Sequence, residues 1–230
     1  AKIALHLAKE GASVAVNYSS SKEAADKVVS EIIKNGGKAV AIQANLAKPN
    51  EIETLFTETK KAFGKLDILV NNAGVYQFVP IEEVNQEHFN KIFDLNVLGL
   101  LLAIKESVKH FGSSGGCIIN ISSIASTSAP ATSAVYSASK ASVDAITKVL
   151  AKELGPKHIR VISINPGMVE TEGTHTGGFL EGDFHKEVEA STPLGRIGQP
   201  EDIAPAVVFF ASSDASWITG EALNISGGYR

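Results

Sequence analysis

The sequence has few of the features that stabilise a secreted fold or a membrane protein. Cys117 is the single cysteine among 230 residues, which excludes an internal disulfide and a cysteine-based metal cluster. The six histidines have no metal-ligand spacing, so we expect no metal site. The longest apolar runs, Val97–Ile104 and Ile203–Ala211, are far shorter than the roughly 20 residues that cross a bilayer. We expect a protein of the reducing cytoplasm that has no membrane partner.

An excess of basic charge is also missing. The chain has 21 Lys and Arg residues against 25 Asp and Glu residues, which gives a formal net charge of −4. Without a basic surplus there is no electrostatic reason to expect nucleic acid as a partner. The 44% of hydrophobic residues is ordinary for a globular protein and excludes a disordered chain.

A glycine-rich phosphate-binding turn is the third missing feature. No G-x-G-x-x-G or P-loop pattern occurs in the chain. The chain opens with a helical pattern, Ala1–Glu10, where a nucleotide-binding α/β fold opens with a strand and a turn into its first helix. We expect the sequence to be trimmed of that strand and turn, because the first helix would otherwise be half uncovered.

Short apolar strands alternate with amphipathic helices along the whole chain. We predict strands over Ser13–Asn17, Lys38–Gln43, Leu66–Asn71, Cys117–Ser122, Ile159–Asn165 and Glu221–Ser226. Helices are predicted over Ala1–Glu10, from a Ser20–Glu23 capping box to Asn35, from Pro49 to Phe63, and over Glu87–Phe111, Ala134–Leu154 and Glu201–Ser213, with an irregular stretch over Gly173–Gly198. This alternation indicates one α/β domain over residues 1–230, a doubly wound parallel sheet that binds ligands beyond the carboxyl ends of its strands.

Tyr136 and Lys140 are four residues apart on a predicted helix, so their side chains share one face. The ordinary tyrosine pKa of about 10 is too high for efficient proton exchange near neutral pH. A nearby ammonium favours the phenolate, so we expect Lys140 to lower the pKa of Tyr136. Ser123 ends a predicted strand and adds a hydroxyl that can stabilise negative charge on a substrate oxygen. The alternative is that Tyr136 only packs its ring.

The spacing alone is a weak signal, because Tyr18 and Lys22 share it at the end of a predicted strand. The wider pattern is far more specific. It comprises Asn71-Asn72-Ala73-Gly74, Asn96, Ile121-Ser122-Ser123, Tyr136-Ser137-Ala138-Ser139-Lys140, Asn165-Pro166-Gly167, Pro193-Leu194-Gly195-Arg196, Pro200-Glu201-Asp202-Ile203, and Thr219-Gly220 through Gly227-Gly228. This set resembles the short-chain dehydrogenase/reductase family in order and spacing over essentially the whole chain.

The resemblance implies a Rossmann-like fold and a role for each of four side chains. Tyr136 is implied as the catalytic acid and base, and Lys140 as the residue that lowers its pKa and holds the nicotinamide ribose. Ser123 is implied as the hydroxyl that orients the carbonyl. Asn96 is implied as a helix-distorting residue in the path of proton relay.

The resemblance also implies two sets of cofactor-binding residues. Asn71, Asn72, Ala73 and Gly74 are expected to line the adenosine side, and Pro166, Gly167, Val169 and Thr171 to border the nicotinamide. Two alternatives stay open. Asn71 and Asn72 could have only a structural role at the end of a strand, and Pro166-Gly167 could be a simple turn. The pair Asn45 and Leu46 stands where the family usually has an acidic residue for the adenine amino group, and the Asn carbonyl can accept that bond instead.

The predicted cofactor is NADP(H) rather than NAD(H). Enzymes specific for NAD place a carboxylate near the end of the second strand for the ribose hydroxyls. The corresponding segment here is Asn17, Tyr18 and Ser19, with no acidic residue before Glu23. A carboxylate would repel a 2′-phosphate, whereas hydroxyls and Lys22 would not.

These expectations predict an NADP(H)-dependent oxidoreductase that interconverts a small-molecule carbonyl compound and its secondary alcohol. Two alternatives are a 3-oxoacyl-[acyl-carrier-protein] reductase and a non-catalytic NADP(H)-sensing regulator. Substrate choice is expected in the glycine-rich segment Val169–Lys186, which includes Phe179 and Leu180. The resemblance implies a homotetramer or homodimer that pairs the helices containing Leu98–Lys109 and Ser139–Leu154.

Overall fold

Parallel strands form the centre of the molecule. The computed structural model describes residues 1–178 and 183–230. Within these residues, one ladder pairs β1 with β2 and a second runs in the order β3-β4-β5-β6, with every pairing parallel. The strand bounds are β1 Ser13–Tyr18, β2 Lys38–Gln43, β3 Ile68–Asn71, β4 Gly116–Ile121, β5 Ile159–Pro166 and β6 Ala222–Ile225. All six predicted strands are confirmed to within about two residues at each end.

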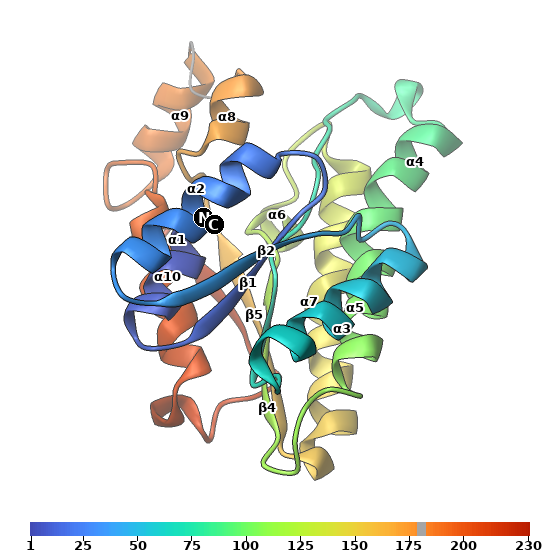
Figure 1. Cartoon of the computed structure of the whole chain (residues 1–230). Helices are drawn as coiled ribbons and strands as arrows, with labels where there is room; N and C mark the ends of the chain where they lie inside the picture. The colour runs from blue at the N-terminus through green and yellow to red at the C-terminus, as the bar shows by residue number, and fades with distance from the viewer. Residues whose placement is uncertain (179–182) are drawn as a thin grey trace.

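Helices cover both sides of the strands (Figure 1). In that view α1, α2 and α10 lie on one side, and α3, α5 and α7 lie on the other. The helix bounds are α1 Lys2–Lys9, α2 Lys22–Lys34, α3 Pro49–Phe63, α4 Gln86–Phe93, α5 Leu100–Ser107, α6 Ala125–Ser128, α7 Ala134–Leu154, α8 Glu172–Thr176, α9 Asp183–Ser191 and α10 Pro200–Ala211. The predicted single-domain α/β fold is therefore confirmed.

Successive side chains of β4 and β5 point to opposite faces of the sheet, so they pack alternately against the helices on one side and on the other. Ile118 and its partner Val161 pack against Val143 and other residues of α5 and α7. The next pair, Ile119 and Ile162, packs in a cluster with residues of α10. Because both faces of these strands are buried, their sequences are almost continuously apolar. The buried strands thereby determine where the polar residues at their carboxyl ends lie.

Three local predictions differ from the structure. The Ser20–Glu23 capping box is wrong, since α2 begins at Lys22 and its N-cap Ser21 makes no side-chain cap hydrogen bond. The predicted helix Glu87–Phe111 is interrupted by a π-helical segment, Asp94–Gly99. The segment predicted as irregular over Gly173–Gly198 contains α8 and α9, and α8 starts at a Thr171 capping box. Phe179 and Leu180, expected in a substrate-binding segment, lie outside the described residues.

In the described parts of the chain, no helix is both long enough and apolar enough to cross a bilayer.

Candidate active site

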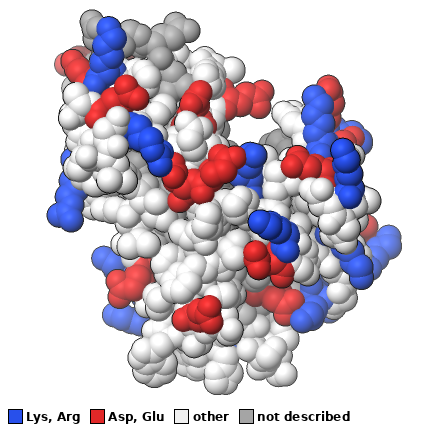
Figure 2. Space-filling model, turned by 90° about the vertical axis from the view of Figure 1, so that its left-hand side faces the viewer, with Lys and Arg blue, Asp and Glu red and all other residues white. Residues whose placement is uncertain are grey.

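A cavity of about 960 Å³ opens where the carboxyl ends of β3, β4 and β5 meet. Its lining also includes the first turn of α1, the segment that leads into α8, and residues at the start of α7. The face of the molecule drawn in Figure 2 is hollowed between two lobes, and acidic side chains gather beside the hollow. Three carboxylates, Glu170, Glu172 and Glu201, contribute to the cavity lining.

Tyr136 lies in the first turn of α7 and lines this cavity. Its ring meets Phe78 and Tyr76 edge-on, with centroid separations of 5.6 Å and 6.3 Å. Burial raises the pKa of Tyr136 above its ordinary value of 10, while a hydrogen bond with the Ser123 side chain acts in the opposite direction. The phenol is therefore protonated at neutral pH.

Ser123 is the second residue after β4 and is held beside the end of β5. The backbone N–H of Ile124 donates to the Pro166 carbonyl at 2.9 Å, which fixes the turn. The Ser123 hydroxyl oxygen accepts from the backbone N–H of Ala125 at 3.1 Å. Because this bond occupies a lone pair, the hydroxyl proton remains available to a partner on the cavity side.

Lys140 lies one turn after Tyr136, and its side chain is buried. Its Nζ is 5.9 Å from the centroid of the Tyr136 ring and donates to the Ile121 carbonyl at 2.9 Å. Burial lowers the pKa of Lys140 to about 8, although the carboxylate of Asp144 acts to raise it. Burial outweighs the other influences on Tyr136 and raises its pKa, whereas a pKa of about 8 leaves Lys140 mostly protonated at neutral pH, so the expected lowering of the Tyr136 pKa by Lys140 stays a prediction.

Asn96 lies in the π-helical segment and is almost fully buried. Its Oδ1 accepts from the Val75 N–H at 2.9 Å, and its Nδ2 donates to the Val75 carbonyl at 2.9 Å. The same Nδ2 lies 3.1 Å from Oγ of Ser139, a residue of α7. The structure thus shows the expected helix distortion and a positioning contact, while a part in proton relay stays a prediction.

The expected adenosine-side residues separate into two groups. Asn71 is buried outside the cavity lining and donates to Oδ1 of Asn120 at 2.9 Å, which agrees with the alternative that it ends a strand. Asn72 and Gly74 line the cavity, and Ala73 is exposed between them. A Cβ on Gly74 would lie 3.3 Å from Oδ1 of Asn96 and 3.5 Å from the Lys140 Nζ, so glycine keeps the approach to this amine open.

The other predicted residues lie at two places. Pro166, Gly167, Val169 and Thr171 line the cavity, as expected. The remaining ones lie outside the lining. Asn17 and Tyr18 end β1 and Ser19 follows it, while Asn45 and Leu46 come after β2.

The side chains after β1 and β2 have partners within the protein. The Asn17 side chain donates to the Ala44 carbonyl at 3.0 Å, and Oδ1 of Asn45 accepts from the Ala47 N–H at 2.9 Å. Lys22, which was expected not to repel a 2′-phosphate, pairs with Asp26 at 2.6 Å on an exposed face. Tyr18 and Ser19 remain on the surface beside these contacts.

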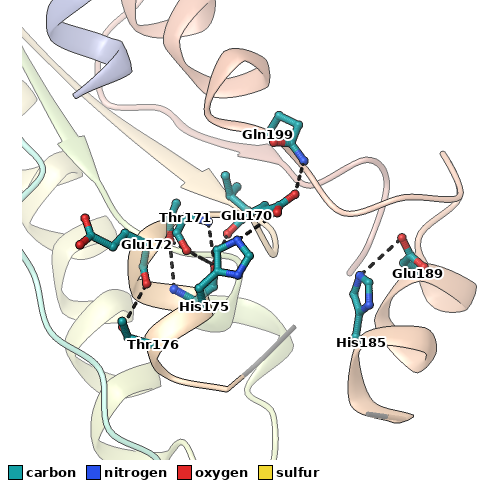
Figure 3. A network of polar contacts seen from close by, with 10 residues as sticks. Glu170, Thr171, Glu172, His175, Thr176, His185, Glu189 and Gln199 are labelled. Carbon is teal, nitrogen blue, oxygen red and sulfur yellow. Dashed lines mark hydrogen bonds and ion pairs between the residues drawn. The ribbon is translucent and has the colours of Figure 1, made fainter. Parts of the chain in front are cut away.

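Glu170 and His175 belong to the predicted substrate segment Val169–Lys186, whereas Gln199, which also lines the cavity, was not predicted. Figure 3 shows Glu170 between the other two: Gln199 Nε2 donates to its Oε2 at 2.8 Å, and the His175 ring lies 3.0 Å from its Oε1. These two contacts lower the pKa of Glu170. Tyr76 and Phe78 were also missed, and the only available signal was a pair of aromatic residues directly after the Asn-Asn-Ala-Gly motif.

Comparison with known proteins decides which family this site belongs to. A family model described as enoyl-(acyl carrier protein) reductase matches residues 1–230. An uncharacterized oxidoreductase of Methylorubrum extorquens is 53% identical over 230 residues, which are 100% of this chain and 92% of that protein. The chain belongs to the short-chain dehydrogenase/reductase family.

Solved short-chain dehydrogenase/reductase structures are also similar to this chain. A dehydrogenase/reductase from Sinorhizobium meliloti is 38% identical with a TM-score of 0.95, covering 100% of this chain and 89% of that one. A short-chain dehydrogenase from Burkholderia cenocepacia, solved in complex with NADP, is 32% identical with a TM-score of 0.93, covering 99% of this chain and 91% of that one. The expected family and its Rossmann-like fold are confirmed.

The buried amine of Lys140 predicts a pH-dependent stability. Its pKa is about 8 in the folded protein against 10.5 for an ordinary lysine, so between these values the unfolded chain binds more protons. Its contribution to the free energy of unfolding therefore rises with pH in that window. We expect the wild-type free energy of unfolding, relative to Lys140→Met, to increase by about 2 kcal/mol from pH 7 to pH 9.5 in urea titrations.

The matched control for this experiment is Lys148→Met, a substitution on the exposed side of the same helix. It should follow the wild-type pH dependence. Parallel pH curves for the wild type and Lys140→Met would contradict the prediction.

Proposed function

We propose that residues 1–230 form one catalytic domain that transfers a hydride between NADP(H) and a carbonyl compound or its secondary alcohol. One observation carries the proposal: the phenol of Tyr136, hydrogen-bonded to Ser123, lines a cavity of about 960 Å³ one helical turn from the buried amine of Lys140. A phenol and a second hydroxyl aimed at one point can hold and protonate a carbonyl oxygen.

Each side chain has a distinct task in this reaction. The bound dinucleotide supplies the hydride that forms the new C–H bond at the carbonyl carbon. Ser123 donates its hydroxyl proton in a hydrogen bond to the carbonyl oxygen and stabilises the charge that develops there. Tyr136 then transfers its phenolic proton to this oxygen to give the alcohol. The raised pKa of Tyr136 keeps this proton on the phenol at neutral pH, so the side chain can act as the proton donor.

The residues around the cavity are suited to a dinucleotide. The first turn of α1 lines the cavity, and the backbone N–H groups of a helix N-terminus favour an anionic phosphate. Gly74 keeps Lys140 accessible to a ribose hydroxyl, and Asn72 and Ala73 adjoin it. The segment from Pro166 to Thr171 borders the other side of the cavity and would hold the nicotinamide. Asn45 and Leu46 would adjoin the adenine.

The choice of NADP(H) over NAD(H) rests on the end of β1. Tyr18 ends this strand and Ser19 follows it, and neither supplies a carboxylate that would repel a 2′-phosphate. The Burkholderia cenocepacia relative was solved with NADP, which agrees with this choice.

The 3-oxoacyl-[acyl-carrier-protein] reductase alternative shares the same chemistry and differs in substrate. The matching family model carries an acyl-carrier-protein reductase description, which keeps this alternative open. The carboxylates of Glu170 and Glu172 line the cavity, and their negative charge disfavours the binding of a substrate with a negatively charged chain. A non-catalytic regulator would bind NADPH without oxidising it. An NADPH-oxidation assay with free ketones and with an acyl-carrier-protein thioester separates the three candidates.

Removing the phenolic hydroxyl tests the proposed chemistry. We expect Tyr136→Phe to lower kcat for ketone reduction by at least about 100-fold, because general acid catalysis contributes roughly 10²–10⁴-fold. Steady-state NADPH oxidation measures this loss, and thermal unfolding checks that the fold is retained. Ser142→Ala, which removes a hydroxyl elsewhere on α7, is the control and should keep full activity. Retention of most activity in Tyr136→Phe would end the proposal.

A carboxylate at the end of β1 tests the cofactor choice. We expect Ser19→Asp to lower kcat/KM for NADPH by about 10-fold or more, since one close like-charge pair costs on the order of 1–2 kcal/mol. The value for NADH should change little. Ser30→Asp adds the same charge on the exposed side of α2 and should leave both cofactors unaffected. A wild-type preference for NADH would refute the choice directly.

We also propose that the chain assembles as a homotetramer through α5 and α7. Leu101 on α5 and Val149 on α7 are 37% and 53% exposed, which leaves apolar side chains on the two helices expected to pair. Sedimentation velocity should show a tetramer for the wild type and a smaller species for Leu101→Lys/Val149→Lys. Ile33→Lys on α2, at a side chain 56% exposed, is the control and should remain tetrameric. A monomeric wild type would refute this assembly.

A further inference from the structure

Residues 75–79 lie in the segment between β3 and α4, and hydrogen bonds hold every second one of them in place. Asn96 holds both backbone groups of Val75, each at 2.9 Å. The ring of His88 lies 3.3 Å from the Gln77 carbonyl, and Lys91 donates to the Gln77 side chain at 3.1 Å. The Val79 N–H donates to the Thr132 carbonyl at 2.9 Å. A segment without regular secondary structure is thus held in place along one side.

The alternate residues of this segment, Tyr76 and Phe78, line the cavity. Their rings are 6.2 Å apart and inclined by only 30°, so they present similarly oriented faces. Both meet the Tyr136 ring edge-on, at 75° for Tyr76 and 68° for Phe78. The contacts at Val75, Gln77 and Val79 therefore hold two aromatic rings beside the phenol proposed to donate the proton.

Tyr76 also lies close to α8, which contributes to the cavity lining. A Cβ on Gly173 of α8 would lie only 3.0 Å from the Tyr76 hydroxyl oxygen, so α8 approaches this ring closely where glycine stands. A substrate whose oxygen is held by Tyr136 and Ser123 has its neighbouring substituent in the space that these rings border. The rings are thus placed to contact the substituent, and not the reacting atoms.

We propose that Tyr76 and Phe78 form an aromatic wall that selects carbonyl compounds with a planar aromatic ring attached to the carbonyl carbon. The inference rests on the proposed reductase function and names the substrate class of that site. Aromatic pairs in offset or edge-to-face contact gain stability beyond the burial of area, which corresponds to about a 2- to 12-fold preference over a saturated ring of similar size.

Acetophenone and cyclohexyl methyl ketone form a matched pair for the test, because both carry a methyl ketone on a six-membered ring and only one ring is aromatic. The dissociation constants of both ketones are measured by ligand-observed NMR, and kcat/KM by NADPH oxidation. We expect the wild type to favour acetophenone. The double variant Tyr76→Leu/Phe78→Leu should lower this preference by about 3- to 10-fold in both measurements.

Two further variants test whether the aromatic rings of Tyr76 and Phe78 cause the preference for acetophenone. Tyr76→Phe retains the ring and should retain the preference. Phe89→Leu removes an aromatic side chain that stacks on Phe93 in α4, outside the cavity lining, and should leave both ketones unaffected. Circular dichroism checks that each variant is folded.

Failure of the inference differs from failure of the proposed function. If the wild type binds both ketones equally or binds neither, or if the double variant keeps the wild-type preference, the aromatic wall is refuted even when turnover is normal. If acetophenone binds preferentially and the preference is lost in the double variant, the wall is supported. If in that case neither ketone is reduced, the reductase assignment fails instead.

Discussion

The side chain of Asn96 links the two parts of the molecule that make the site. One part is the segment after β3, which Asn96 holds through both backbone groups of Val75. The other is α7, which it contacts through the hydroxyl of Ser139, between Tyr136 and Lys140. A primary amide suits this position because it donates and accepts at once, whereas a carboxylate or an apolar side chain would leave buried backbone groups unpaired. The local π-helical turn carries Asn96 to this place, and such turns are frequent at functional sites.

Burial acts on two titratable groups of α7, Tyr136 and Lys140, in opposite directions and favours the neutral form of each. It raises the pKa of the Tyr136 phenol and lowers that of the Lys140 amine to about 8. Reasoning from spacing considered only the attraction between an ammonium and a phenolate and left out desolvation, which cannot be seen in a sequence. The neutral phenol that results is a proton donor, which is what reduction of a carbonyl requires at neutral pH.

The sequence predicted correctly those elements that depend on long patterns of apolar residues. The six strands and α7 follow from runs of residues such as Cys117–Ile121, which are buried on both faces. It failed where a few polar contacts decide the conformation. Helix α8 is only five residues long and depends on the Thr171 cap, and the Asn71 amide is bound to Asn120 from a neighbouring strand. Tyr76 and Phe78 lie on an irregular segment whose anchors are distant in sequence, so no local period indicates their orientation.

Helix α7 shows why the chemistry and the architecture of this domain are coupled. Tyr136, Lys140 and Asp144 follow one another at intervals of four residues, on one face of the helix. The Asp144 carboxylate accepts from Oγ of Ser163 at 2.8 Å and from Nδ2 of Asn165 at 2.9 Å, both on β5. A largely buried carboxylate needs such donors, so these bonds fix the register of α7 against β5 more strictly than interchangeable apolar contacts would. Since β5 leads directly into the cavity segment that begins at Pro166, the same two bonds set the position of that segment relative to the Tyr136 phenol.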